Sequence, residues 1–142
     1  MKAVIQRVNG AALRVADRTV CEIGKGLVVY LGVESGDVEA DIPPFCAKIA
    51  ALRIFADGNG KMNRSVNDIG GEILLVPNFT LCADTSHGNR PDFFGAMKPD
   101  GARTFFDACV RELGRIARVS AGVFGADMTI DQSNDGPVTI IY

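Results

Sequence analysis

Histidine is almost absent from this sequence. The only one is His87, and the four cysteines (Cys21, Cys46, Cys82 and Cys109) form no C-x-x-C pair. A zinc site needs clustered Cys and His ligands, so this scarcity argues against one. A Ser/His/Asp or Cys/His nucleophilic site would have to use His87, which lies in a Gly/Asn/Ser-rich segment typical of a solvated loop. Because the cysteines are scattered through apolar segments, we expect buried, reduced thiols.

An excess of basic residues and a long apolar run are also missing. The formal net charge is −2 and the pI is about 5.3, which argues against a protein that grips nucleic acid mainly by neutralising phosphates. Recognition of a nucleic-acid end stays open. No apolar run approaches the roughly 18 residues of a membrane-spanning helix, and the chain begins with the strand-like KAVIQRV instead of a charged and apolar leader. We therefore expect a soluble, cytoplasmic protein without a membrane segment.

Two motifs that could bind ligands are incomplete. The segment 57–60 (DGNG) begins like a calcium loop, but Lys61 and Met62 stand where such a loop needs an oxygen ligand and a glycine. The turn at 24–26 (GKG) lacks the third glycine of a dinucleotide fingerprint and precedes a strand instead of following one. The sequence therefore predicts neither a metal nor a cofactor.

Hydrophobic periodicity predicts one α/β domain over residues 1–142. Helices are expected over 42–52, which carboxylates and prolines introduce, and over 100–117, where apolar residues recur at helical spacing. The uniformly apolar run 27–33 suits a strand covered on both faces, which indicates layers on both sides of a sheet. The remaining strands are expected over 2–8, 11–15, 19–23, 53–55, 72–81, 119–124, 126–131 and 138–142.

One backbone feature with chemical potential lies in the expected strand 72–81. Pro77 and Asn78 interrupt this strand, and such an interruption leaves nearby N–H groups unpaired. Backbone donors aimed at a developing oxyanion contribute roughly 3 to 4 kcal/mol each, so an activated ester needs little more than these donors and a positioned water. Thr80 is the one hydroxyl in this segment, and it is either an ordinary strand residue or a nucleophile or hydrogen-bond donor.

A second backbone feature is the segment 134–137 (NDGP). Its composition alone favours an ordinary hairpin turn between the strands at 126–131 and 138–142. Alternatively, the segment presents main-chain carbonyls to a ligand, because Gly136 accepts dihedrals closed to other residues and Pro137 has no N–H and a fixed φ. The sequence leaves the isomer of the Gly136–Pro137 bond open.

The chain resembles the D-aminoacyl-tRNA deacylases (the D-tyrosyl-tRNA deacylase family) over essentially its full length. Seven sets of residues, spread along the whole chain, carry this resemblance. The most specific are FTL at 79–81, FGADM at 124–128 and NDGPVT at 134–139. The others are AVIQRV at 3–8, GLVVYLGV at 26–33, LRIF at 52–55 with KMN at 61–63, and ADT at 83–85 with RP at 90–91.

The resemblance implies a three-layer α/β/β sandwich with mixed and antiparallel sheets, and a homodimer whose two active sites lie at the subunit interface. It also implies an enzyme that hydrolyses the ester of D-aminoacyl-tRNA, releasing the free D-amino acid and tRNA without a metal or cofactor. In that family a cis Gly-Pro peptide reaches into the partner's pocket as a chiral gate.

Carried onto this sequence, the resemblance assigns the gate to Gly136 and Pro137, with Arg7 holding it in place. The backbone of Phe79 and Thr80 is the catalytic element and would face the ester carbonyl. The usual Ser-Gln pair of the family is replaced here by Pro77-Asn78. The resemblance implies five substrate-binding positions in this sequence: Gly136, Pro137, Arg7, Asn78 and Met128.

A gate of this kind has a simple physical basis. D- and L-esters exchange a hydrogen and a side chain on one carbon, so a rigid backbone wall where the L side chain would go rejects L-esters. Glycine has no side chain to clash, so we expect glycyl-tRNA, such as that mischarged on tRNA-Ala, to be hydrolysed too.

Two other interpretations stay open: a catalytically inactive relative that only binds aminoacyl-tRNA ends, and a ligand-binding dimer unrelated to tRNA.

Overall fold

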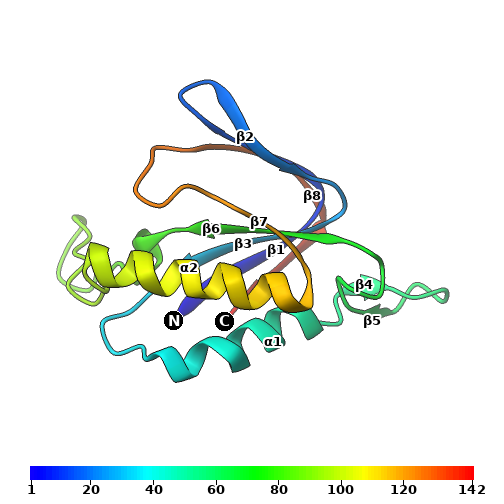
Figure 1. Cartoon of the computed structure of the whole chain (residues 1–142), viewed down its shortest axis with the longest axis horizontal. Coiled ribbons are helices and arrows are strands. Elements are labelled where there is room, and N and C mark those ends of the chain that lie inside the picture. Colours follow the sequence, from blue (N-terminus) through cyan, green and yellow to red (C-terminus); the bar gives the residue numbers. More distant parts are fainter.

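The structure, a computed structural model, describes residues 1–142 and consists of three layers (Figure 1). Helices α1 (Ile42–Ala51) and α2 (Pro99–Ile116) pack together as one layer, drawn at the bottom of Figure 1. A β-layer lies on these helices, and a second β-layer folds over its other face. The expected α/β/β sandwich is therefore confirmed.

Both β-layers belong to one hydrogen-bonded sheet of six strands that folds back on itself. The long strand β1 (Lys2–Val15) pairs over its first half with β3 (Gly26–Gly32) and over its second half with β2 (Arg18–Ile23). β3 then pairs in parallel with β6 (Glu72–Pro77), and β6 pairs in parallel with β7 (Arg118–Ala121). Since the other pairs are antiparallel, the sheet is mixed.

The remaining elements are short except for the last strand. The 3₁₀ turn η1 (Glu39–Asp41) leads into α1, and η2 (Phe79–Cys82) follows β6. A separate hairpin pairs β4 (Phe55–Ala56) with β5 (Met62–Arg64). The final strand β8 (Thr129–Ile141) pairs only with β1, so its other edge is free.

Two hydrophobic cores hold the layers together, and β3 contributes to both. Leu27, Val29 and Leu31 belong to a core of 20 buried residues that also includes side chains from both helices. Val28 belongs to a core of 7 buried residues between the two β-layers. Successive side chains of a strand point to opposite faces, so both faces of β3 are covered. The expectation for residues 27–33 is confirmed.

Both helices lie where the sequence predicts them, within one residue at each end, but several strands differ. The strands expected at 2–8 and 11–15 form the single bent strand β1. The strand expected at 53–55 is reduced to Phe55–Ala56, and that at 119–124 ends at Ala121. The strand expected over 72–81 ends at Pro77, because the chain then turns into η2 and packs against Gly32.

The hairpin turn favoured by the composition of residues 134–137 is wrong. These residues lie inside the continuous strand β8, which pairs with β1 on both sides of them. A turn needs the two flanking strands to pair with each other, whereas here each flank finds its partner in β1. The NDGP segment is therefore accommodated as an irregularity of the strand.

All four cysteines are free, as expected. Cys46, Cys82 and Cys109 are buried, whereas Cys21 is only half-buried. Neither helix has the length and apolar character required to cross a membrane.

Candidate active site

The turn after β6 leaves two backbone donors free. The N–H of Asn78 still donates to the carbonyl of Leu31, at 2.8 Å, and so extends the β3–β6 ladder by one residue. The first hydrogen bond of η2 runs from the N–H of Leu81 to the carbonyl of Asn78, at 3.3 Å. The N–H groups of Phe79 and Thr80 lie between these two bonds, in the first turn of a helix, where N–H groups lack an intrahelical acceptor. The sequence-based expectation of unpaired donors is met at these two residues.

The side chains at this turn include no activated nucleophile. The Thr80 hydroxyl donates to Oδ1 of Asn78 at 2.5 Å, and no hydrogen bond joins it to a histidine or a carboxylate. His87 is exposed and has no hydrogen-bond or ion-pair partner in the chain. Burial raises the pKa of Cys82, which keeps this neighbouring sulfur as a thiol. The chemistry available here is therefore that of the backbone donors.

A cavity of about 550 Å³ opens beside this turn. Pro77 and Asn78 line one side of it, and Lys98 lies at its edge. Five of the eight phenylalanines of the chain form its walls: Phe79, Phe93, Phe94, Phe106 and Phe124. Aromatic walls suit a flat ring, such as a nucleobase or an aromatic side chain.

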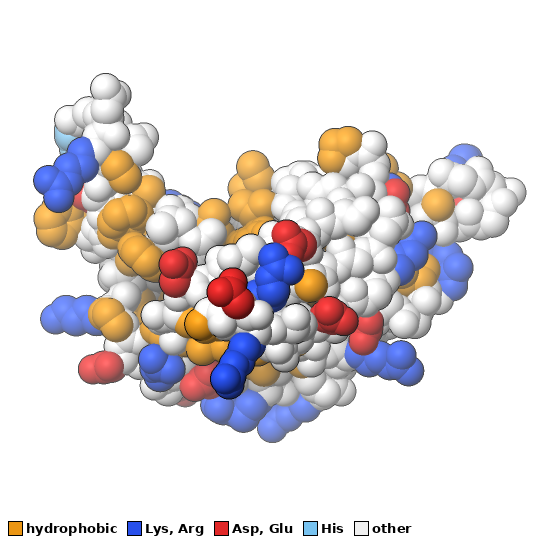
Figure 2. All heavy atoms as spheres, turned by 90° about the horizontal axis from the view of Figure 1, so that it is seen from above, with side chains coloured by type: hydrophobic (Ala, Val, Ile, Leu, Met, Phe, Trp, Pro, Cys, Tyr) orange, Lys and Arg blue, Asp and Glu red, His pale blue; other side chains and the backbone are white.

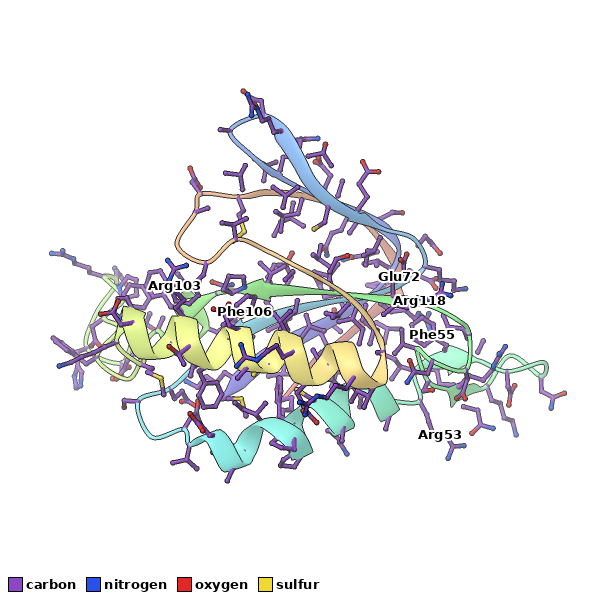
Figure 3. The ribbon with its side chains drawn as sticks, viewed as in Figure 1. Arg53, Phe55, Glu72, Arg103, Phe106 and Arg118 are labelled. Atoms are coloured by element: carbon purple, nitrogen blue, oxygen red, sulfur yellow. The ribbon has the colours of Figure 1, made fainter.

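The figures show how the helix and the loop frame this cavity. Phe106 and Arg103 lie along α2 (Figure 3), and the Arg103 guanidinium stacks over the ring of Phe124 at 4.9 Å from its centroid. Hydrophobic side chains gather around the base of the projecting loop that carries the only histidine (Figure 2). Phe94 is 92% exposed and Phe79 is 58% exposed, so the mouth of the cavity presents aromatic surface to solvent.

Met128 lies near Pro77, at the start of the turn. A side chain at Gly122 would meet Cδ of Pro77 at 3.0 Å and Sδ of Met128 at 3.1 Å, which shows that these three residues pack together. Met128 also packs against the core between the two β-layers. It therefore lies next to the Pro77 end of the turn but does not line the cavity.

The second candidate element is a four-residue bulge in β8, Asp135–Val138. Thr139 pairs with Gln6 and Asn134 pairs with Val8, so the four residues between them face a single residue of β1, Arg7. Gly136 and Pro137 are exposed at the free edge of the sheet. The middle of the bulge is thus accessible at the surface.

Arg7 holds this bulge from the helix side of the sheet. Its Nε contacts both the carbonyl oxygen of Asp135, at 3.3 Å, and Oδ2 of the same residue, at 3.2 Å. Its Nη1 donates to the carbonyl of Ile54 at 2.5 Å. The Arg7 side chain is only 13% exposed, so these bonds are shielded from water. Arg7 therefore joins the bulge to the segment that begins the β4–β5 hairpin.

The peptide bond between Gly136 and Pro137 is cis. Gly136 has a φ of 120°, a conformation that L side chains rarely adopt. A Cβ at this position would lie 3.2 Å from Nη2 of Arg7 and 3.0 Å from the N of Val138. Glycine is therefore the residue that suits this position.

Within one chain the two elements lie far apart. Pro77 pairs with Leu31 and Leu31 with Ala3, whereas the bulge faces Arg7, four residues further along β1. Strands β1 and β3 also separate β8 from β6. At about 3.3 Å per residue and 4.8 Å per strand, the separation is roughly 20 Å. The structure brings Asn78, Phe79, Thr80 and Met128 to one region, and Arg7, Gly136 and Pro137 to another.

Comparison with known proteins places this fold in a family of tRNA deacylases. The family model of D-Tyr-tRNA(Tyr) deacylase matches residues 4–142. The chain belongs to this family.

Two solved structures are similar to the chain over almost its whole length. A structure described as c-Myc DNA Unwinding Element Binding Protein is 39% identical, with a TM-score of 0.95, and the match covers 100% of this chain and 97% of that one. A probable eukaryotic D-amino acid tRNA deacylase is 17% identical, with a TM-score of 0.85, covering 99% of this chain and 97% of that one. The second similarity concerns the fold alone.

The phenylalanine walls of the cavity were not predicted from the sequence. Phe124 entered there only as part of the FGADM motif at 124–128, whereas in the structure it packs against Phe106 of α2, with centroids 6.2 Å apart. The adjacent pair Phe93 and Phe94, next to a polar loop, was the available signal. Only the tertiary structure brings these rings together with Phe79.

Proposed function

We propose that the protein is a cytoplasmic D-aminoacyl-tRNA deacylase, which hydrolyses the ester between a D-amino acid and the terminal ribose of tRNA. The family membership supports the substrate class. The single observation that carries the reaction is the pair of free N–H groups at Phe79 and Thr80, beside a cavity with aromatic walls.

In this proposal the two N–H groups bind the ester carbonyl oxygen. Water attacks the carbonyl carbon, the oxygen becomes an oxyanion, and the two donors stabilise it. The intermediate then collapses, the bond to the ribose oxygen breaks, and that oxygen takes a proton. The neighbouring 2′-hydroxyl of the terminal adenosine assists the water, which supplies the proton transfer that no nearby side chain offers. The products are the free D-amino acid and tRNA.

Chiral selection is assigned to Gly136 and Pro137. Their backbone forms a wall with no side chain at Gly136, and Arg7 holds the preceding residue. This wall excludes an L side chain by contact and is indifferent to glycine. We therefore include glycyl-tRNA among the substrates.

The separation of roughly 20 Å between the bulge and the Phe79–Thr80 turn supports a homodimer. A single aminoacyl ester is too small to contact both elements in one chain. In the proposed homodimer the exposed bulge of one protomer enters the cavity of its partner. Each active site then takes its donors from one chain and its gate from the other.

The direct test compares purified protein on D-tyrosyl-, L-tyrosyl- and glycyl-tRNA with a chelator present. We expect the D and glycyl esters to be cleaved and the L ester to be spared, without an effect of the chelator. Cleavage of the D ester with glycyl-tRNA intact would contradict the gate. Cleavage of none of them would favour the binding-only relative, with Pro77-Asn78 as the first positions to change.

Mixing two defective proteins tests the shared site. One protein carries Thr80→Pro, which removes an oxyanion donor, and the other carries Arg7→Ala, which frees the gate. If the gate acts across the interface, a mixed dimer contains one site with intact donors and an intact gate. We expect the mixture to regain selective cleavage of the D ester, whereas a gate acting within its own chain would leave only the unselective cleavage by the Arg7→Ala protein.

Binding of duplex DNA is less well supported as a function. The chain carries a formal net charge of −2, and neutralising the phosphates of a duplex requires a concentrated basic face.

A further inference from the structure

A chain of side-chain hydrogen bonds lies on the face of β1 opposite to Arg7. Its centre is Gln132 of β8, whose Nε2 donates to Oε1 of Gln6 at 2.6 Å and to Oδ1 of Asn134 at 2.7 Å. Gln6 in turn donates from Nε2 to the hydroxyl of Thr139 at 3.3 Å. Asn134 and Thr139 are the residues directly before and after the four-residue bulge. The two glutamines therefore connect both ends of the bulge to each other.

Tyr30 of β3 sets the orientation of the Gln132 amide in these hydrogen bonds. Its hydroxyl donates to Oε1 of Gln132 at 2.9 Å, so the Nε2 group of Gln132 must point toward Gln6 and Asn134. Burial raises the pKa of Tyr30, which keeps this hydroxyl protonated and donating. The four hydrogen bonds run in one consistent direction, from Tyr30 through Gln132 to Asn134 and, through Gln6, to Thr139.

The bulge is thus held from both faces of the sheet. Arg7 binds Asp135 from the helix side. On the side between the β-layers, Gln132 binds Asn134 and Gln6 binds Thr139, the two residues that flank the bulge. Arg7 alone holds only the first residue of the bulge by hydrogen bonds. Thr139, which follows the bulge, pairs with Gln6 in the β1–β8 ladder and also accepts a hydrogen bond from the Gln6 side chain.

We propose that Gln132, oriented by Tyr30 and acting through Gln6, is a positioning residue that fixes the span of the Gly136–Pro137 gate and so determines discrimination between D- and L-esters. This inference rests on the proposed function of the gate. These side chains act through the backbone of the bulge to which they are bound. Without these side-chain hydrogen bonds the ladder still pairs Asn134 and Thr139 with β1, but the bulge between them is less restrained and the wall yields to an L side chain.

The experiment measures kcat/KM with D-tyrosyl- and L-tyrosyl-tRNA for Gln132→Met and Thr139→Val. Met keeps the length of the glutamine side chain but removes its hydrogen bonds to Gln6 and Asn134. Val keeps the branched shape of threonine but removes the acceptor for Gln6. We expect the ratio of D to L cleavage to fall about tenfold in each, mainly through a gain with the L ester, as the loss of one or two hydrogen bonds to an element implies. Tyr30→Phe should act in the same direction, because Gln132 is then free to rotate its amide.

Two variants serve as controls. Thr139→Ser keeps the hydroxyl acceptor and should keep the wild-type ratio of D to L cleavage. Asp131→Asn changes the residue before Gln132. The carboxylate of Asp131 lies 2.6 Å from the guanidinium of Arg14 and takes no part in holding the bulge. This variant should keep the wild-type rates with both esters.

The outcomes separate this inference from the proposed function. If wild-type protein cleaves D-tyrosyl-tRNA and spares the L ester, but Gln132→Met and Thr139→Val keep that selectivity, the positioning role is wrong and the gate stands. If both variants lose D and L cleavage together with a fall in Tm, the hydrogen bonds of Gln132 and Gln6 have only a structural role and the inference is also wrong. A wild-type protein that cleaves neither ester would remove the proposed function itself.

Discussion

The turn at Asn78–Thr80 ends a strand, whereas the bulge at Asp135–Val138 interrupts one, and the two elements present different groups to their surroundings. The turn follows a central strand and leaves N–H groups free next to an apolar cavity. The bulge lies on an edge strand and is built around a proline, which has no N–H, and a glycine with no side chain. The first element is suited to stabilise negative charge, and the second to form a wall.

The two elements also differ in what holds them. The turn is held by packing near Gly32 and Met128 and by one backbone hydrogen bond to Leu31, whereas side-chain hydrogen bonds from Arg7, Gln6 and Gln132 hold the bulge and its flanks. Packing and hydrogen bonding respond to different substitutions. Rate and chiral selectivity should therefore be separable by mutation, and the following predictions test that separation.

The largest expected effect is the loss of a backbone donor in Thr80→Pro. Removing this N–H should lower kcat with D-tyrosyl-tRNA by about a hundredfold or more, as for other oxyanion donors. The D-to-L ratio should stay high, because the bulge is untouched. Single-turnover kinetics with both esters measures this. A variant that keeps its rate would show that the Thr80 N–H does not bind the oxyanion.

Arg7→Ala should act on the other element. It leaves the carboxylate of Asp135 without its cation, so we expect a loss of about 2 kcal/mol in the free energy of unfolding and a fall of at least tenfold in the D-to-L ratio. Chemical denaturation and paired kinetics measure these two effects. Arg14→Ala is the matched control, since it removes an exposed ion pair with Asp131 that contributes at most about 1 kcal/mol. Equal selectivity in the two variants would argue against Arg7 as the support of the gate.

Thr80→Ala should have a small effect that contrasts with Thr80→Pro. It removes only the hydroxyl bound to Asn78 and keeps the N–H, so the rate should stay within about fivefold of wild type. The same kinetic assay applies. A loss as large as that of Thr80→Pro would instead identify the hydroxyl as the nucleophile.

His87→Ala should have the smallest effect. The side chain is exposed and has no partner in the chain, so rate and stability should change by no more than about 0.5 kcal/mol, or roughly twofold. A loss of activity in His87→Ala as large as that in Thr80→Pro would instead establish a histidine-dependent mechanism.

Sequence reasoning identified the two helices, the strand covered on both faces and the unpaired donors near Pro77. It succeeded there because periodicity and proline chemistry act over a few neighbouring residues. It failed for the segment 134–137, where turn-forming residues lie inside a strand, because the pairing partner of β8 is at the other end of the chain. The role of Gln132 was invisible for the same reason, since its partners Gln6 and Tyr30 are more than 100 residues away.

The sequence by itself determined the family, the order of the elements and the two positions where the backbone departs from regular structure. These properties depend on residue type and local spacing, which the sequence states directly. Only the tertiary structure decided that five phenylalanines enclose a cavity beside Phe79 and Thr80. It also decided that the Gly136–Pro137 bulge lies roughly 20 Å from that cavity within one chain, because strand order and register in a folded sheet arise from contacts between distant segments.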